Sequence, residues 1–161
     1  MESTLELHRL DYGSPELANV LPEVLRLSNA IFDTDPHSKY ASLEEWTRRL
    51  SAPGSIIAYL SPPSSPAHPV AFLFAHPRRH TPPLAGGETD SVHVWLAGVL
   101  PERRKEGCLA RMVAVLGSAQ VMTVCTTPDA YPVMWKWLMG RGWSVERDLG
   151  GGKVMLSRRT G

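Results

Sequence analysis

The sequence predicts a mixed α/β fold in a single domain over residues 1–161, and three observations support this. Short segments with strand-like apolar patterning alternate with amphipathic segments of helical period. Strand segments follow one another directly in the middle of the chain, as antiparallel neighbours do, whereas later strands are separated by crossover helices. A chain of 161 residues can bury one proper core, and no linker divides it. The expected order of elements is β-α-α-β-β-β-α-β-α-β-β.

Local signals in the first part of the chain predict one strand and two helices. Residues 5–10 alternate apolar and polar side chains, which is typical of a half-buried strand. Residues 14–16, Ser-Pro-Glu, are typical of a helix cap and first turn, and Pro22 then marks either a kink or the true start of that helix. Ser42 begins a capping box, Ser-Leu-Glu-Glu, for a second helix that continues to Leu50.

The rest of the chain alternates apolar strands with connections rich in proline and glycine. The segments 61–69 and 77–90 are predicted to be exposed loops because both contain clustered prolines. We expect strands at residues 55–60, 70–75, 121–125, 143–147 and 153–158, a further strand from residue 91, a helix through residue 116 and a last helix from residue 127. The glycine-rich residues 148–152 would join the last two strands into a hairpin.

Composition argues against several functional classes. The formal net charge is +1, so nothing indicates broad binding to nucleic acid or to a membrane surface. No apolar run approaches the roughly 20 residues that span a bilayer, and the N-terminus lacks the pattern of a signal peptide, so we expect a cytoplasmic protein. We expect Cys108 and Cys125 to be reduced thiols. The scattered histidines lack metal-ligand spacing, so we expect no metal site.

The most informative segment is residues 91–116, in which an apolar strand runs into a basic, glycine-containing turn that begins an amphipathic helix. The turn reads Arg-Lys-Glu-Gly-Cys-Leu-Ala over residues 104–110. The start of a helix presents backbone N–H groups and the positive end of the helix dipole, and phosphate commonly binds there. The segment therefore predicts a site for a phosphorylated small molecule. The alternative is a surface turn that only joins a strand to a helix.

The strand before this turn ends in Val-Leu-Pro at residues 99–101, followed by Arg104 and Gly107. This spacing resembles the signature of the GCN5-related N-acetyltransferases, the GNAT family, in which Arg/Gln-x-x-Gly-x-Gly/Ala follows Val-x-Pro. Leu109 departs from the pattern, because it stands where the second small residue is expected. Residues 134–143, MWKWLMGRGW, resemble the family's last helix, and fungal members share a Trp-Leu…Gly-Trp ending.

The resemblance implies a binding site for acetyl-CoA. Backbone N–H groups of the turn and helix start would hold the pyrophosphate, and the backbone at the strand end would pair with the pantetheine arm. The Val99 N–H would polarise the thioester carbonyl, which is stabilisation by a fixed backbone donor. The implied coenzyme contacts are Val99, Leu100, Arg103, Arg104, Lys105, Glu106, Gly107, Cys108, Leu109 and Ala110.

The resemblance also suggests catalytic groups. An amine that arrives as an ammonium must lose a proton before it can attack. His93 matches a histidine of the serotonin-acetylating branch, and its ordinary pKa of about 6.5 suits a base; the alternative is a strand histidine satisfied by a neighbour or by solvent. Many members use a tyrosine near the last helix as the acid, but that position is Leu138 here. Tyr131 is the candidate substitute, or else it packs or contacts substrate.

The acceptor amine has its own candidates. Residues 33–37, Asp-Thr-Asp-Pro-His, follow the first helix, and in the family this segment lines the acceptor entrance. The carboxylates of Asp33 and Asp35 would attract a cationic amine, although both residues are also common at turns. Trp95, on the same strand face as His93, would form an aromatic wall for substrate, and the alternative is core packing.

These expectations combine into an N-acetyltransferase. It would move the acetyl group from acetyl-CoA to a primary amine by direct attack in a ternary complex. A small-molecule amine is favoured over an amino sugar, an amino acid or a protein amine. One alternative is a GNAT-fold module that binds acetyl-CoA, or nothing, without turnover; another is transfer to oxygen or of a longer acyl group. The expected partners are acetyl-CoA and the acceptor, without nucleic acid or membrane, in a monomer or homodimer.

Overall fold

The computed structural model of the chain describes residues 4–35, 37–38, 41–104, 106–117 and 119–160. The chain divides into two compact units. The first unit comprises Met1–His76 with Leu96–Val115, and the second comprises Pro77–Trp95 with Leu116–Gly161. The single domain expected over residues 1–161 stays a prediction.

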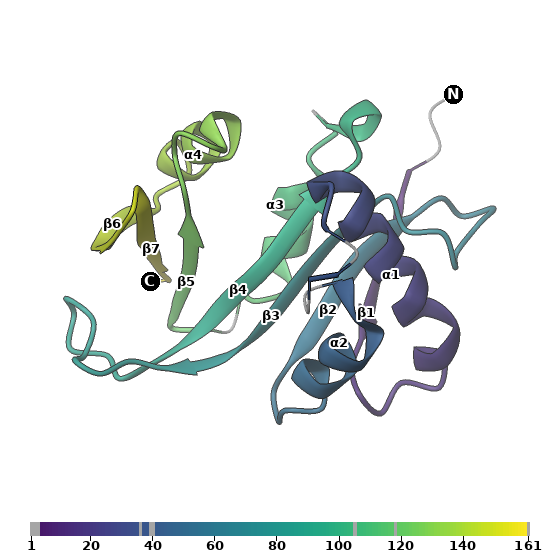
Figure 1. Cartoon of the computed structure of the whole chain (residues 1–161), viewed down its shortest axis with the longest axis horizontal. Coiled ribbons are helices and arrows are strands. Elements are labelled where there is room, and N and C mark those ends of the chain that lie inside the picture. Colours follow the sequence, from purple (N-terminus) through teal and green to yellow (C-terminus); the bar gives the residue numbers. More distant parts are fainter. Residues whose placement is uncertain (1–3, 36, 39–40, 105, 118, 161) are drawn as a thin grey trace. The chain divides into compact units, whose positions relative to one another are not determined.

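The elements follow one another in the predicted order (Figure 1). They are β1 (Glu6–Leu10), α1 (Leu17–Phe32), α2 (Leu43–Leu50), β2 (Ile56–Ser61), β3 (Ala71–Arg79), β4 (Asp90–Val99), the 3-10 turn η2 (Pro101–Arg103), α3 (Cys108–Ala114), β5 (Val121–Thr126), α4 (Pro132–Met139), β6 (Ser144–Gly150) and β7 (Lys153–Arg159). The seven strands are hydrogen-bonded in the order β1-β2-β3-β4-β5-β7-β6. Because β4 and β5 run parallel whereas β1–β2, β2–β3, β5–β7 and β6–β7 are antiparallel, the mixed α/β prediction is confirmed.

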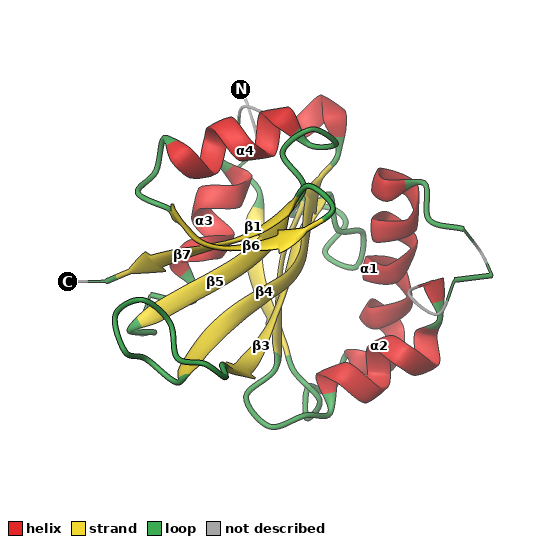
Figure 2. Cartoon of the chain, turned by 60° about the vertical axis from the view of Figure 1, so that its left-hand side comes forward, coloured by secondary structure: helices red, strands yellow, loops and turns green. Residues whose placement is uncertain are grey.

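The first unit packs helices against both faces of its strands. Helices α1 and α2 lie on one side and α3 on the other (Figure 2). Ser42 caps α2 as predicted, because its hydroxyl oxygen accepts the Glu45 N–H at 3.3 Å. Trp46 of α2 is fully buried, and its ring lies 5.8 Å from the Phe72 ring and 5.3 Å from the Phe74 ring of β3. This aromatic cluster fixes α2 on the sheet.

Helix α1 begins later than its sequence signals suggest. Leu17 is the first helical residue, and the Ser14 hydroxyl accepts the Asp11 N–H instead of capping the helix. Pro22 lies inside the helix, which continues through it to Phe32. The apolar face, with Val24 fully buried, supplies packing that offsets the hydrogen bond lost at the proline.

The second unit contains the terminal hairpin and its own apolar cluster. Strands β6 and β7 are joined across Gly151 and Gly152, which both have the positive φ that favours glycine. Leu84 packs with Val121 and Met155 in a buried cluster. The predicted hairpin is therefore confirmed, with β6 reaching further than expected.

The prediction of an exposed loop over residues 77–90 is wrong in part. Strand β3 continues to Arg79, and His80 and Leu84 are buried. The segment is held down because the Arg147 guanidinium donates to the Pro83 carbonyl at 2.8 Å and Arg159 forms an ion pair with Glu88. These partners are distant in sequence, so local composition could not reveal them.

Helix α4 also begins later than predicted. Residues 127–131 form turns, in which the Tyr131 N–H donates to the Thr127 carbonyl at 2.9 Å. The helix then begins at Pro132, whose fixed φ and missing N–H suit a first helical position. Within the described part of the chain, no helix combines the length and the apolar character needed to cross a membrane.

Candidate functional site

The turn before α3 has the geometry of an anion-binding helix start. Gly107 precedes the helix with φ +74, in the left-handed region that favours glycine. The Arg111 N–H donates to the Gly107 carbonyl at 3.2 Å as the helix begins. The N–H groups of residues 108–110 come before this bond, and helix geometry gives them no partner inside the helix. A side chain at position 107 would meet nothing within 4 Å, so glycine is required there by backbone conformation and not by space.

Charged side chains of this turn are already engaged within the first unit. The Arg103 guanidinium lies 3.4 Å from a carboxylate oxygen of Glu106, and Arg104 Nε donates to the Val99 carbonyl at 3.3 Å. The bond from Arg104 ties the turn back to the end of β4. Lys105 lies outside the described residues.

The end of β4 offers fewer free backbone groups than the sequence suggests. The Leu100 N–H donates to the Val70 carbonyl at 2.9 Å, and the Leu100 carbonyl accepts the Arg103 N–H at 2.9 Å. A ligand could take the Leu100 N–H only by breaking the first of these bonds. The Val99 carbonyl also accepts a hydrogen bond, from Arg104 Nε, so a ligand that pairs with the backbone here would compete with internal bonds at both residues.

Cys108 points its thiol into the protein. The residue is buried, and its Sγ lies 3.8 Å from the Arg103 carbonyl oxygen, to which it can donate. Burial, followed by the nearby Glu106 carboxylate, raises the pKa of the Cys108 thiol above its ordinary value. The thiol therefore stays neutral, and only the backbone of this residue faces the helix start as a donor.

His93 is the centre of a buried chain of side-chain hydrogen bonds in the second unit. Its Nδ1 lies 2.8 Å from the Thr123 hydroxyl, and its Nε2 lies 3.2 Å from an Arg78 Nη1. The Thr123 hydroxyl lies 2.7 Å from the Ser91 hydroxyl, which lies 2.7 Å from His80 Nε2. Three strands contribute to it: Arg78 from β3, Ser91 and His93 from β4, and Thr123 from β5.

Arg78 sets the direction of this chain, because a guanidinium can only donate. His93 Nε2 must then be the acceptor, and the neutral ring carries its proton on Nδ1, which donates to Thr123. The Thr123 and Ser91 hydroxyls can each donate or accept, and they extend the chain to His80 Nε2. The bond from Arg78 therefore fixes His93 as a neutral ring in this arrangement. These contacts agree with the alternative interpretation of His93, in which neighbouring side chains satisfy the hydrogen bonds of a strand histidine.

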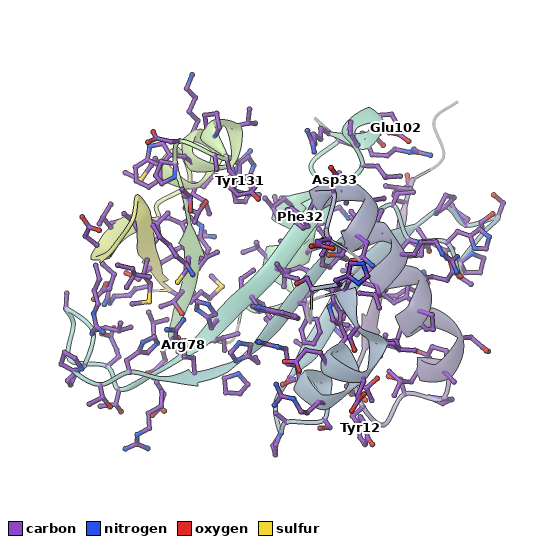
Figure 3. All side chains as sticks on the ribbon, viewed as in Figure 1. Tyr12, Phe32, Asp33, Arg78, Glu102 and Tyr131 are labelled. Atoms are coloured by element: carbon purple, nitrogen blue, oxygen red, sulfur yellow. The ribbon has the colours of Figure 1, made fainter. Side chains whose placement is uncertain are left out.

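Sequence analysis did not find Arg78, Ser91, Thr123 or His80. Ser91 and His93 share a strand face, which was a usable signal for two members of the chain. Arg78 and His80 carried no such signal, because residues 77–90 read as an exposed loop. Figure 3 labels Arg78, which is only partly buried.

The remaining predicted residues lie in both units. Asp33, in the first unit, ends α1 with φ +48, and the Asp35 carboxylate accepts the His37 N–H at 2.9 Å in a local turn. Both carboxylates are exposed. In the second unit, Trp95 is partly buried on β4, and Tyr131 precedes α4 with its side chain about half exposed (Figure 3). The first unit thus carries the predicted coenzyme and acidic residues, and the second carries His93, Trp95 and Tyr131.

Metal ligands are not gathered anywhere in the part of the chain that the structure describes. No group of three or more His, Cys, Asp or Glu side chains there is placed to hold an ion. The two cysteines, Cys108 and Cys125, form no disulfide.

Comparisons with known proteins give matches in structure only: no family model and no curated protein matches the sequence. The aminoglycoside N-acetyltransferase AAC(6')-Iy in complex with CoA is similar with a TM-score of 0.72 and 15% identity, over 93% of this chain and 94% of that one. NAA60 of Arabidopsis thaliana, bound to a bisubstrate analogue, gives a TM-score of 0.67 and 12% identity over 98% and 100%.

A protein from Desulfovibrio desulfuricans assigned to the GNAT family of acetyltransferases is similar with a TM-score of 0.65 and 16% identity, over 97% of this chain and 99% of that one. The chain therefore has the fold of the GNAT acetyltransferases, as the sequence resemblance predicted. At these identities the likeness defines the fold alone.

His80 predicts a dependence of stability on pH. Its pKa is lowered from the ordinary value of 6.5, first by burial and then by the cation of Arg78. Above pH 6.5 the ring is neutral in both folded and unfolded chains, so it adds no pH dependence. Below that pH the unfolded chain binds a proton that the folded chain resists, so the free energy of unfolding falls. We expect the urea midpoint to decrease from pH 7.5 to pH 5.5.

The variant His80→Gln keeps an acceptor for Ser91 and should show a smaller decrease over the same pH range. His68→Gln, at an exposed loop position, is the matched control and should retain the wild-type decrease. Equal decreases in all three proteins would contradict this role of His80.

Proposed function

We propose that the chain is an acetyl-CoA-dependent N-acetyltransferase that acetylates a primary amine. The observation that carries this proposal is the continuous path from the end of β4 through the left-handed Gly107 into α3, within a fold shared with an acetyltransferase that was crystallised with CoA. That path puts a strand end suited to a thioester beside a helix start suited to a phosphate. A general phosphate site would need only the second of these features.

The coenzyme would bind along this path. The N–H groups of Gly107, Cys108, Leu109 and Ala110 would receive the pyrophosphate at the positive end of the helix dipole. Arg103 and Arg104 would add positive charge around it, and the pairing of Glu106 with Arg103 limits repulsion between that carboxylate and the phosphates. Leu100 would contribute contact through its side chain, since its backbone groups are already bonded.

The reaction would be a direct transfer. The neutral amine attacks the thioester carbon, the carbonyl oxygen gains negative charge, and the Val99 N–H stabilises that charge as it develops. The attacking nitrogen then loses a proton, the carbon–sulfur bond breaks to leave the amide, and CoA leaves as a thiolate that takes up a proton. No covalent acyl-enzyme is required, and the neutral, inward-pointing Cys108 thiol is unsuited to forming one.

His93 is the proposed base, with two conditions that the structure attaches to it. Its Nε2 lone pair accepts from Arg78, so taking up a proton requires that hydrogen bond to open. His93 and Val99 are also six residues apart in β4, and extended chain of that length spans about 20 Å. That span is too long for one hydrogen bond or one bridging water, so a base at His93 would need a chain of several waters or side chains to reach the amine.

Tyr131 is the proposed donor of a proton to the departing thiolate. Its partly exposed side chain at the start of α4 leaves the phenol accessible. The thiolate is a fair leaving group, with an ordinary thiol pKa of about 8.5, so solvent can replace a dedicated acid. We expect Tyr131 to influence the rate without being essential.

The acceptor is proposed to be a small primary amine. Asp33 and Asp35 place two exposed carboxylates just after α1, where they would attract a cation. Trp95 would supply an aromatic surface for it. The similar structures include aminoglycoside acetyltransferases and the NatC complex bound to a Gag peptide and CoA, so they leave the choice of acceptor to experiment.

One observation favours a second candidate, a binding module without turnover. Leu138, where many family members carry the acid tyrosine, is buried in the last turn of α4. A side chain that packs there cannot donate a proton. Such a module would bind acetyl-CoA and release no thiol.

The proposed function predicts release of free thiol from acetyl-CoA in the presence of a suitable amine. A panel should contain small primary amines, amino sugars, amino acids and peptides with free N-termini, with acetylated products identified by mass spectrometry. We expect release with at least one small amine. Tight binding of acetyl-CoA with no release for any acceptor would support the module instead.

Gly107 should determine coenzyme affinity through its backbone. Gly107→Val forces a β-branched residue toward a left-handed conformation, which costs about 1–2 kcal/mol or displaces the turn. Gly107→Asn is the matched control, since asparagine tolerates this region. Isothermal calorimetry should show acetyl-CoA binding weakened about tenfold or more by valine and little by asparagine. Equal affinities in the two folded variants would count against a coenzyme site at this turn.

His93→Gln should flatten the rise in turnover between pH 6 and pH 9 while leaving the acetyl-CoA dissociation constant nearly unchanged. The physical reason is that glutamine keeps a hydrogen-bonding side chain but cannot take up a proton. His68→Gln again serves as the control and should keep the wild-type profile. An unchanged pH profile in His93→Gln would remove this residue as the base.

A further inference from the structure

Gly98 occupies a position in β4 where even a methyl group would be crowded. The residue is buried and comes directly before Val99. A methyl group there would lie 3.0 Å from Ile31 Cδ1, 3.2 Å from Ile31 Cγ2 and 3.3 Å from Phe72 Cε1. Carbon atoms in favourable contact are about 3.5–4.0 Å apart, so all three neighbours would be too close. Gly98 has no positive φ, so space is its reason for being glycine.

The two neighbours of Gly98 differ in how far they can yield. Phe72 is fully buried, and its ring packs against that of Trp46, which is itself fully buried against Phe74. This wall cannot move without disturbing the aromatic cluster. Ile31 is only partly buried and lies in the last turn of α1. Crowding at position 98 would therefore act on Ile31, whose side chain must rotate or move together with the end of α1.

The end of α1 carries Asp33 with it. The N–H groups of Asp33 and Thr34 both donate to the Asn29 carbonyl, the latter at 3.1 Å. Asp33 is also held at φ +48, an uncommon conformation for a residue other than glycine. These bonds tie Asp33 and Thr34 to the last turn of α1, which contains Ile31, so these residues should move together. Where Ile31 seats on β4 thus decides where the Asp33 carboxylate is presented.

We infer that Gly98 is a positioning residue for the acceptor amine. Its missing side chain lets the last turn of α1 seat against β4 one residue from Val99, and this seating sets the location of the Asp33 carboxylate relative to the reacting thioester. The inference rests on the proposed function, because it takes Val99 as the thioester site and Asp33 as an amine-binding group. Gly98 acts through Ile31 and touches neither reactant.

The geometry of the strand separates this effect from the coenzyme site. Successive residues of a strand face opposite sides, so position 98 faces α1 whereas the side chains of Ala97 and Val99 face the other way. None of the three atoms nearest to a methyl group at position 98 belongs to α3 or to the Gly107 turn, which would hold the coenzyme. A change at position 98 should therefore alter the binding of the amine and spare that of acetyl-CoA.

The test is a double-mutant cycle of Gly98→Ala and Ile31→Ala. Gly98→Ala should raise the amine KM about tenfold or more, because displacement of a binding group by a fraction of an ångström is costly, and leave the acetyl-CoA dissociation constant within twofold. Ile31→Ala removes both atoms of Ile31 that the new methyl group would meet. The double variant should therefore return the amine KM toward the wild-type value, to within about threefold.

Gly13→Ala is the control, since a methyl group there meets only one atom, at an ordinary 3.5 Å, and it should leave both constants unchanged. If Gly98→Ala does not fold, Ile31→Ala alone serves, because it frees the seat of α1 and should raise the amine KM with unchanged acetyl-CoA affinity. Wild-type turnover with an unchanged amine KM in the folded variants, or with no rescue in the double variant, overturns this inference and leaves the proposed function standing. Absence of turnover in the wild type overturns both.

Discussion

The packing of Trp46 against Phe72 and Phe74 is the interaction on which the rest of the first unit depends. Three large side chains with no exposed surface attach α2 to β3 and leave Phe72 unable to move. Phe72 is in turn one wall of the space over Gly98, and the other wall is the end of α1. The position of Asp33 and Asp35 after α1 thus depends on an aromatic cluster that contacts no reactant.

A second constraint operates in the other unit and is polar. Burying two histidines, a serine and a threonine is unfavourable unless each finds a partner, and the chain from Arg78 to His80 supplies one to every member. Because the guanidinium only donates, His93 Nε2 must accept its hydrogen bond. The same arrangement occupies the lone pair that a base at His93 would need, so structural satisfaction and catalysis compete for one atom.

How much of this was predictable differs from residue to residue. The Ser42 cap and the Gly-Gly hairpin follow from short-range chemistry, because a hydroxyl before a helix and glycines with positive φ act on their immediate neighbours. The start of α4 at Pro132 was missed because Pro128 also suits a first helical position, and the local pattern does not distinguish the two prolines. Arg78 and His80 were assigned to an exposed loop because their partners, on β4 and β5, are remote in sequence.

The sequence by itself determined the order of elements and the glycine-containing turn before α3, since periodicity, capping and backbone freedom are local properties. The same is true of the basic residues around that turn. Only the tertiary structure decided that Leu100 has its N–H bonded to Val70, that Cys108 points inward, and that Gly98 is glycine because Ile31 and Phe72 occupy the space a side chain would need. Those facts depend on which distant segments are brought together in a close-packed interior. A local pattern along the chain does not contain that information.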